Sequence, residues 1–302
     1  MPGDIFYNMA RDLSREQSIP LENAYVQVIQ RYNYDPDEPL LDQLGRYYGA
    51  LAKGNLGTSM VFQAKTVNDI IAYALPWTLF ITCLALSITF VLGITIGSLM
   101  VWHRKGVLNA FLTTFSTVTS AIPVFVWAFL LMVLFVFELG WFPINGSYDI
   151  AYTPGFNLPF LGSVAFHAVL PVATYVLTMM GMWALQMKSS GIAVMGEDYI
   201  TAAYARGLSA GVIRRRYMMR NAMLPVITML AVTFAMMIST GSFVETTYTY
   251  PGMGRQLTTA SGNRDYTVMQ GLLLVMSMCT IFANLITDFI YLKLDPRIKT
   301  GG

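Results

Sequence analysis

Residues 188–223 read KSSGIAVMGEDYITAAYARGLSAGVIRRRYMMRNAM and lie between two long hydrophobic stretches. The segment is basic, because its two acidic residues, Glu197 and Asp198, are outnumbered by Lys188, Arg206, Arg214, Arg215, Arg216 and Arg220. Small residues also recur in it, at Ala202, Ala203, Ala205 and Gly207. Small side chains let two helices approach closely. The segment therefore predicts a shaped, charged surface on which a partner docks.

The rest of the chain has the composition of a membrane protein. Hydrophobic residues make up 55% of it and charged residues 12%, against about 25% charged residues in soluble domains. Five stretches are long enough to cross a bilayer as helices, which takes roughly 20 apolar residues: about 77–101, 113–137, 164–187, 224–244 and 269–292. Their hydrophobicity is continuous rather than alternating, which predicts an all-α polytopic membrane protein. Pro123 and Pro171 are expected to kink their helices.

The distribution of Lys and Arg predicts the orientation. The loops 102–110 and 188–223 and the tail 293–302 carry eleven of these residues, and the loops 138–163 and 245–268 carry two. The positive-inside rule places the first set in the cytoplasm. Residues 1–76 are then outside, the transmembrane domain spans 77–292, and the C-terminus is cytoplasmic.

Residues 1–76 are predicted to form a small extracytoplasmic helical region. Ser18 is expected to cap a helix with Pro20 in its first turn, followed by an apolar face of Leu21, Tyr25, Val28, Ile29 and Tyr32. The segment Asp35–Pro39 predicts a turn. A second helix is expected to end near Gly54, with a stripe of Leu40, Leu41, Leu44, Tyr48 and Leu51. This region either docks a partner or packs on the helix ends.

The N-terminus presents a topological problem, because a polar segment must cross the membrane and no signal peptide precedes it. Met1-Pro2-Gly3-Asp4 begins that segment directly. We expect a first transmembrane helix upstream that is absent from this chain. The alternative is a genuine start with export of the segment after synthesis.

The residues that carry most enzyme chemistry are scarce. The chain has two Cys, Cys83 and Cys279, and two His, His103 and His167, in no metal-ligand spacing. It also lacks the G-x-x-x-x-G-K-[ST] phosphate loop. We therefore expect no metal site, no bound cofactor and no catalytic residue, and the energy for any transport comes from another subunit.

Within 188–223, one helix is expected to carry Tyr199, Ala202 and Ala203 along one side. The pattern predicts a break at Gly207 and a second helix through Val212, Ile213 and Tyr217. This is a helix–turn–helix lying across the membrane surface. A plain basic helix bound to lipid would explain the arginines but not the run of small residues.

Residues 197–209, EDYITAAYARGLS, and 220–225, RNAMLP, resemble the coupling loop of binding-protein-dependent ABC importer permeases. Within them the chain resembles the B-type subunit of the oligopeptide, dipeptide and nickel branch. The similarity extends through Pro2–Asp4, Gly54–Ser59, Ser120–Pro123, His167–Pro171, Val244–Thr246, Tyr250–Arg255, Arg264–Tyr266, Gln270–Gly271 and Asp295–Arg297. The chain departs from the pattern at Thr201, where the superfamily has glutamate, at Asn55, where the branch has aspartate, and in starting after the first helix.

The resemblance implies a type I ABC importer transmembrane domain (MetI-like), with five visible spans and the missing first one. It also implies a prokaryotic cytoplasmic membrane, alternating access and partners that this chain does not contain. These are a second homologous permease subunit forming a heterodimer, two ATP-binding subunits that use ATP and Mg, and an extracytoplasmic solute-binding protein. Lipid surrounds the complex, and no nucleic acid is involved.

The resemblance assigns two groups of site residues. The ATPase-coupling contact is expected at Glu197, Asp198, Tyr199, Ala202, Ala203, Arg206, Gly207, Leu208 and Arg220. The extracytoplasmic side, which faces the binding protein, is expected at Glu245, Pro251, Gly252, Gly254, Arg255 and Asp265.

The cargo implied is an oligopeptide or dipeptide, with oligosaccharides and nickel chelates carried by similar permeases. Two other classes of function are weighed against the importer. An ion-coupled secondary transporter needs a chain of intramembrane carboxylates or paired half-helices. The predicted spans hold a single acid, Asp288, near the cytoplasmic end of the last one, where a helix cap or a salt bridge explains it. A non-transporting membrane scaffold fits the composition but not the resemblance of residues 197–225.

Overall fold

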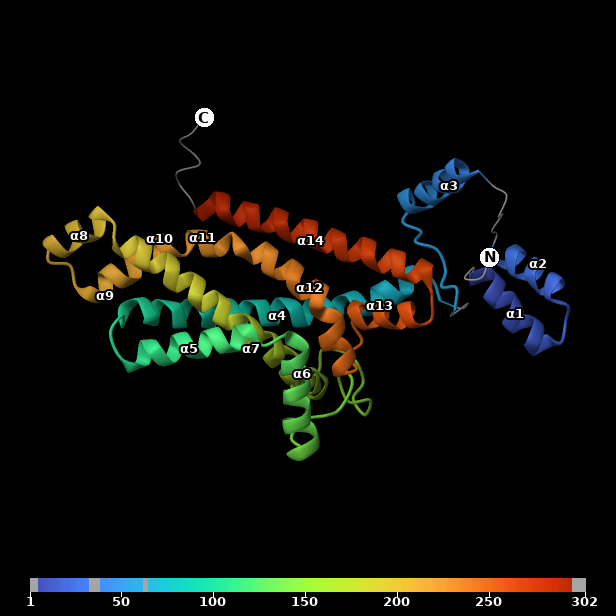
Figure 1. Cartoon of the computed structure of the whole chain (residues 1–302), viewed down its shortest axis with the longest axis horizontal. Helices are drawn as coiled ribbons and strands as arrows, with labels where there is room; N and C mark the ends of the chain where they lie inside the picture. The colour runs from blue at the N-terminus through green and yellow to red at the C-terminus, as the bar shows by residue number, and fades with distance from the viewer. Residues whose placement is uncertain (1–4, 33–38, 62–64, 295–302) are drawn as a thin grey trace. The chain divides into compact units, whose positions relative to one another are not determined.

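The computed structural model describes residues 5–32, 39–61 and 65–294 (Figure 1). Within these ranges the backbone forms helices and one isolated β-bridge between Thr58 and Thr66, which confirms the all-α fold. The chain divides into two compact units, one of Met1–Ile71 with Thr259–Leu272, the other of Ala72–Thr258 with Leu273–Gly302. The expected motifs at 2–4 and 295–297 and most of the turn at 35–39 lie outside the described residues.

The first unit contains a helical hairpin of α1 (Ile5–Gln17) and α2 (Leu21–Tyr32). Phe6 and Ala10 of α1 pack against Ala24 and Val28 of α2. The expected helix at 21–32 is present, but Ser18 does not cap it. Ser18 has a φ of 55° and follows the end of α1.

The second expected outer helix is α3 (Leu40–Ala52), which ends before Gly54. Its apolar stripe was expected to pack or to dock a partner. Within the described residues the stripe is open, since Leu41 is 80% exposed and Tyr48 is 60% exposed.

Four helical segments are long and apolar enough to cross a membrane. They are α4 (Val67–Trp102), α7 (Leu158–Met195), the segment Leu224–Thr247 formed by α11 (Leu224–Ile227) and α12 (Met229–Thr247), and α14 (Tyr266–Leu294). A bent pair of helices supplies a fifth when counted as one span. Each overlaps one predicted stretch, and α4 begins ten residues before the predicted 77.

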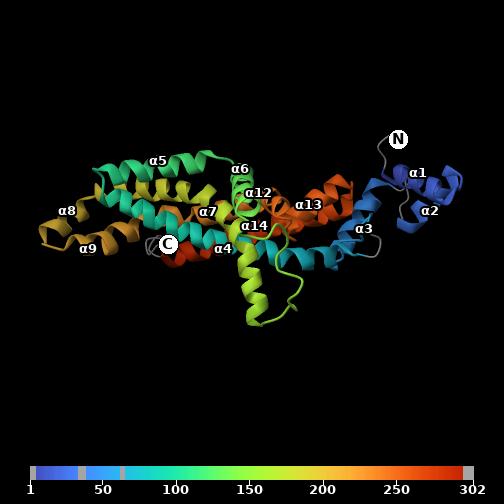
Figure 2. The ribbon, with the colours of Figure 1, turned by 90° about the horizontal axis from the view of Figure 1, so that it is seen from below.

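The predicted span 113–137 is not a single helix. It is divided into α5 (Val107–Ala121) and α6 (Val124–Met132), which continues as the π-helix η1 (Val133–Glu138), with a bend of 97° (Figure 1). The cause is Pro123, because the residue before a proline is driven out of the helical region. Ile122 accordingly is extended, with φ −83° and ψ 123°. Pro171 lies inside α7, which stays helical through it, although the first part of α7 and its remainder run in different directions (Figure 2).

Helix α7 is the centre of the second unit. It contacts α5, α6, α11, α12 and the short α10 (Arg220–Ala222). Its Tyr175, Trp183 and Met187 are almost completely buried. Because α7 continues to Met195, the predicted loop 188–223 begins eight residues later than expected.

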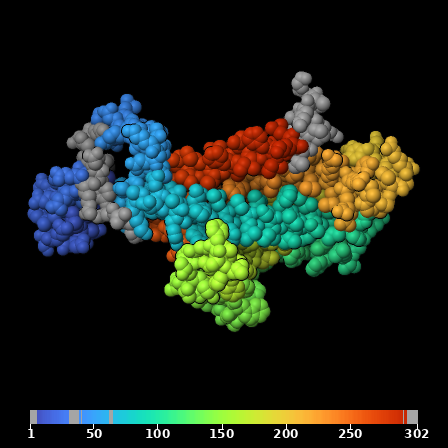
Figure 3. Space-filling view, turned by 180° about the vertical axis from the view of Figure 1, so that it is seen from behind, coloured from blue at the N-terminus to red at the C-terminus, as the bar shows by residue number. Residues whose placement is uncertain are grey.

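Two other connecting segments differ from simple loops. The connection between η1 and α7 projects from the surface of the second unit (Figure 3). The predicted loop 245–268 contains the helix α13 (Met253–Gly262), and α12 extends to Thr247 rather than ending at 244.

Helices α4 and α7 touch through two glycines of α4. A Cβ atom at Gly93 would collide with the Cβ of Trp183, and one at Gly97 would lie 2.6 Å from the Cβ of Met187. These glycines form a G-x-x-x-G pattern, which in membranes allows helix backbones to approach closely.

We predict that Gly97→Ala destabilises the protein by about 1–3 kcal/mol, because an added methyl group overpacks a filled contact. The matched control is Gly162→Ala in α7, where an added Cβ meets no atom within 4 Å. Thermal unfolding of the detergent-solubilised protein measures both variants. Equal transition temperatures for the two would contradict the tight α4–α7 contact.

Candidate functional site

The basic segment singled out in the sequence forms a helical hairpin at one end of the second unit (Figures 1 and 2). Helix α8 (Asp198–Ala205) is followed by a tight turn, the short α9 (Ala210–Val212) and the π-helix η2 (Ile213–Met219). Ile200 and Ala203 of α8 pack against the completely buried Ile213. The predicted helix–turn–helix is therefore present, with its own small apolar core.

Gly207 makes the turn of this hairpin possible. Its φ is +73°, a left-handed conformation that costs other residues roughly 1–2 kcal/mol. The Gly207 amide donates to the Tyr204 carbonyl at 2.9 Å, and the Leu208 amide donates to the Ala203 carbonyl at 3.3 Å. No atom lies within 4 Å of a Cβ built at Gly207, so the position demands glycine for its backbone rather than for space.

The predicted coupling residues divide by exposure. Most are exposed: Glu197, Asp198, Tyr199, Ala202, Arg206, Gly207 and Arg220. Leu208 is half-buried, and Ala203 is 2% exposed. The structure therefore assigns Ala203 to the interior of the hairpin, where its small side chain admits Ile213. Leu208 packs at the edge of this interior, and the exposed positions lie on the surface of the hairpin.

The hairpin is tied to the central helix. Met218 of η2, Ala222 of α10 and Val226 of α11 are completely buried in the main core, together with Met187 of α7. Displacement of α8 therefore acts on a packed interior rather than on a loose loop.

A second group of predicted residues surrounds Glu245, near the opposite end of α12. Glu245 is 2% exposed. Its carboxyl group accepts hydrogen bonds from the Thr78 hydroxyl at 2.7 Å and the Arg255 amide at 3.1 Å. The Thr78 hydroxyl in turn accepts from the Met253 amide at 2.7 Å. Three segments of chain, in α4, α12 and α13, thus meet on one side chain.

The two glycines of Pro251-Gly252-Met253-Gly254 serve this arrangement. A Cβ at Gly252 would collide with the Glu245 carboxyl group, and one at Gly254 would lie 2.7 Å from the Ser242 Cα. Pro251, Gly252 and Gly254 are buried. The sequence analysis placed these residues and Glu245 on the extracytoplasmic side, facing the binding protein. In the structure they are buried and form an internal junction.

Tyr248, three residues after Glu245, makes a second set of buried hydrogen bonds. The Tyr248 hydroxyl donates to the Ala128 carbonyl of α6 at 3.0 Å and lies 3.0 Å from the Thr174 hydroxyl of α7. Burial raises the pKa of Tyr248 to about 12, so the hydroxyl keeps its proton at neutral pH. Arg255 is half-buried and donates to the Thr249 carbonyl at 3.1 Å.

Asp265 has a comparable role in the first unit. It is 1% exposed and accepts hydrogen bonds from the Ser59 hydroxyl, the Met60 amide at 3.1 Å and the Val268 amide at 3.2 Å. Two motifs far apart in the sequence, Gly54–Ser59 and Arg264–Tyr266, are joined in this way. Asp265 was also expected to face a partner, and the structure instead buries it.

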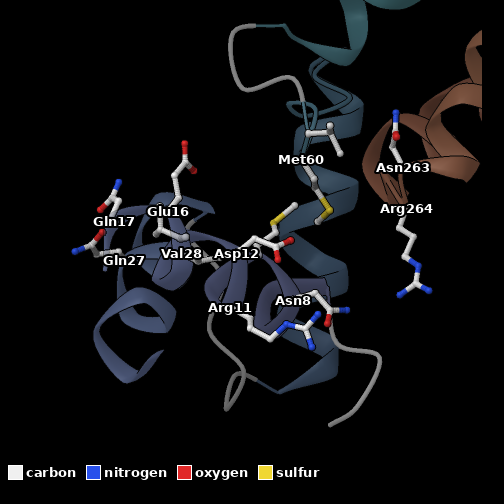
Figure 4. A pocket seen from close by; sticks show the side chains of 13 residues that line it. Asn8, Arg11, Asp12, Glu16, Gln17, Gln27, Val28, Met60, Asn263 and Arg264 are labelled. Carbon is white, nitrogen blue, oxygen red and sulfur yellow. The ribbon is translucent and has the colours of Figure 1, made fainter. Parts of the chain in front are cut away.

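A cavity of about 670 Å³ also lies in the first unit. Figure 4 shows its side chains coming from α1, α2, the segment at Met60 and the turn before α14. Both charge signs line it, with Asp12 and Glu16 opposed by Arg11 and Arg264. Among residues 5–32, 39–61 and 65–294, no three His, Cys, Asp or Glu side chains gather in a metal-binding group.

The sequence reasoning missed two contacts. The partner of Glu245 is Thr78, a threonine in an apolar stretch, and no local pattern connects the two. The close approach of α4 and α7 did have a signal, the G-x-x-x-G pattern at Gly93 and Gly97.

The comparisons with known proteins give one family. The sequence profile described as "Binding-protein-dependent transport system inner membrane component" matches residues 90–300. The oligopeptide transport system permease protein OppB of Haemophilus influenzae is 32% identical over 266 residues, covering 88% of this chain and 83% of that protein. The glutathione transport system permease protein GsiC of Salmonella paratyphi A is 31% identical over 281 residues, covering 93% and 86%.

The di/tripeptide transport system permease protein DppB of Pseudomonas aeruginosa is 29% identical over 277 residues, covering 87% and 82%. Among solved structures, the inward-facing MetNI methionine ABC transporter aligns with a TM-score of 0.60 at 15% identity, covering 75% of this chain and 96% of that one. An amino acid ABC transporter aligns with a TM-score of 0.54 at 16% identity, covering 74% and 93%. These likenesses confirm the expected MetI-like fold.

We predict that Glu245→Ala destabilises the second unit, at about 1–3 kcal/mol for each buried donor left without a partner. Glu245→Gln should lie between Ala and wild type, because its carbonyl still accepts from Thr78 while its NH₂ group opposes the Arg255 amide. Glu138→Ala, at an exposed position, is the control. Thermal unfolding ranks the variants, and a Glu245→Ala protein as stable as Glu138→Ala would refute the junction.

We predict that Asp265→Ala releases residues 59–61, because the Met60 and Val61 amides and the Ser59 hydroxyl lose their shared acceptor. Hydrogen exchange of the Met60 and Val61 amides should accelerate, with exchange in α7 unchanged. Asp42→Ala on the exposed face of α3 should leave the exchange of these amides as in wild type. Unchanged protection in Asp265→Ala would show that another contact holds the segment.

Proposed function

Because this chain belongs to the family of inner-membrane components of binding-protein-dependent transport systems, we propose that it forms half of the translocation pathway of an ATP-driven importer. It is a multi-pass permease subunit of the cytoplasmic membrane. The second half would be a homologous permease subunit in a heterodimer. Two ATP-binding subunits would use ATP and Mg on the cytoplasmic side, and an extracytoplasmic binding protein would deliver the solute. Membership of this family favours an importer subunit over the two alternatives, an ion-coupled secondary transporter and a non-transporting membrane scaffold.

The observation that carries the proposal is the α8–η2 hairpin. It presents Tyr199, Ala202 and Arg206 to a partner, while Ala203 and Ile213 lock it from within. An ATPase subunit that receives this surface would move the hairpin as a rigid body when the ATPase pair closes. Glu197, Asp198, Gly207, Leu208 and Arg220 complete the proposed contact.

The proposed orientation puts this hairpin and the C-terminus in the cytoplasm, as the Lys and Arg distribution predicts. Residues 1–76 and α13 are then extracytoplasmic. The buried positions of Glu245, Gly252 and Asp265 support a role in shaping the outer surface from inside. Exposed residues next to these side chains, rather than the side chains themselves, would then contact the binding protein.

The proposed cargo is a peptide. Relatives covering most of the chain are named for oligopeptide, di/tripeptide and glutathione transport. Oligosaccharides and nickel chelates remain the alternative cargoes. The chain itself would act without catalysis, as the partner ATPases carry out hydrolysis.

The test is the ATPase activity of the complete complex reconstituted in lipid with its binding protein. We expect peptide-loaded binding protein to stimulate ATP hydrolysis above the activity with unloaded binding protein. Stimulation by an oligosaccharide-loaded or nickel-loaded binding protein instead would change the cargo and keep the importer. A complex that copurifies without any ATPase would overturn the importer.

We predict that Gly207→Arg uncouples ATP hydrolysis from transport while the complex still assembles. The bulky side chain enters the proposed ATPase contact, and the left-handed backbone adds strain of roughly 1–2 kcal/mol. Gly207→Asn is the matched control, because asparagine tolerates this conformation and is small.

Transport and ATPase assays on the purified complexes compare the two variants. Coupling should be lost in Gly207→Arg and largely kept in Gly207→Asn. Loss of assembly in both variants would indicate that Gly207 serves folding alone.

A further inference from the structure

A pocket of about 500 Å³ lies beside the hairpin, between the end of α4 and the end of α7. Its polar lining is basic, from His103, Arg104 and Lys105, and its remaining lining is Val101, Trp102, Met195 and Tyr204. No carboxylate lines it. Within the part of the chain that the structure describes, Arg104 and Lys105 form no ion pair.

The loop that carries the cations is held in place. The His103 Nδ1 atom lies 3.2 Å from the Leu99 carbonyl, which leaves its Nε2 atom available. The Asn109 side chain donates to the Arg104 carbonyl at 3.0 Å. Lys188, the nearby cation of α7, is already engaged by the Thr113 hydroxyl at 2.8 Å and does not line the pocket. The loop is thus tied at the His103 ring and the Arg104 carbonyl, and the side chains of Arg104 and Lys105 keep their hydrogen-bond donors for a ligand.

The pocket lies where a membrane-crossing helix ends. Helix α4 qualifies as a membrane span and ends at Trp102. Tryptophan and tyrosine concentrate at the headgroup level of bilayers. Helix α5 follows directly and exposes Val107, Phe111 and Phe115, which are 86%, 62% and 37% exposed. Cations at the interface beside an exposed apolar helix face match a phospholipid, with its phosphate at one end and acyl chains at the other.

The pocket also lies on the opposite side of α8 from the proposed ATPase contact. At 100° per residue, Tyr204 lies about 170° around the helix from the stripe of Tyr199, Ala202 and Arg206. One helix would then contact the ATPase on one side and the membrane surface on the other.

We propose that this pocket binds the phosphate headgroup of an anionic phospholipid of the inner leaflet, through His103, Arg104 and Lys105, with Trp102 and Tyr204 beside the headgroup. The bound lipid holds the α4–α5 loop and α8 together at the membrane surface. Basic pockets between transmembrane helices on the cytoplasmic side are suited to such headgroups. The orientation is that of the proposed function, but binding of lipid is measurable without transport.

The test is native mass spectrometry of the intact complex, titrated with phosphatidylglycerol in detergent. Wild type should retain one tightly bound phosphatidylglycerol that phosphatidylcholine does not replace. The double variant Arg104→Ala/Lys105→Ala should bind it about 30-fold more weakly, the loss expected from two cations near a membrane surface. Arg104→Lys/Lys105→Arg keeps both charges and should bind within about threefold of wild type.

The matched control is Arg215→Ala/Arg216→Ala, which removes two exposed cations of η2 outside the pocket. It should keep the bound lipid at wild-type affinity. Equal loss in both alanine pairs would overturn the pocket in favour of diffuse attraction to the basic surface. Displacement of the lipid by inorganic phosphate or ATP would overturn the lipid as occupant and assign the site to a soluble phosphate. Equal retention of phosphatidylcholine would overturn the phosphate recognition altogether.

Discussion

The close contact between the backbones of α4 and α7 is the constraint on which the second unit depends. In lipid, apolar side chains gain little by leaving their surroundings for a neighbouring helix, so association relies on close packing and on hydrogen bonds. Gly93 and Gly97 supply the packing by letting α7 come within reach of the α4 backbone. The buried Trp183 and Met187 then fill the space on either side. Helices α5, α6, α10, α11 and α12 then pack against α7.

The two ends of the helical core are stabilised by different kinds of interaction. At one end a single carboxyl group, that of Glu245, accepts from donors in α4 and α13 and leaves Gly252 no room for a side chain, while the backbone at Ser242 leaves none at Gly254. At the other end a small apolar core closes the α8–η2 hairpin, and the charged residues are left outside. At the first end the Glu245 carboxyl group is paired within the fold, whereas the second end has an exposed surface suited to a partner.

Much of this organisation could be predicted from the sequence. Continuous apolar stretches predict helices because lipid leaves the backbone no other means of satisfying its polar groups. The residues around Gly207 predicted the hairpin, because a glycine between two helical patterns indicates a tight turn from the local sequence alone. The break of the helix at Pro123 was predicted only as a kink. A proline in the sequence indicates that a helix is interrupted, but the size and direction of the bend depend on the packing of neighbouring helices.

The burial of Glu245 and Asp265 was not predictable in the same way. Both carry charge next to turn residues, which is typical of exposed loops. Their burial depends on donors from segments far away in the chain, Thr78 for one and Ser59 for the other, and a local pattern contains no information about such partners.

The length of α7 has a mechanical consequence. With 38 residues at 1.5 Å each, the helix is about 57 Å long, against a hydrocarbon layer of about 30 Å. Figure 2 shows that the first part of α7 and its remainder run in different directions, so this length is divided between two arms. The arm from Val172 to Met195 is about 36 Å long at 1.5 Å per residue, and a tilt of about 10° around one end displaces the other end by about 6 Å. Because the hairpin follows Met195 and Tyr248 contacts Thr174 near the start of this arm, a small rotation of the arm becomes a displacement of about one helical turn at the hairpin.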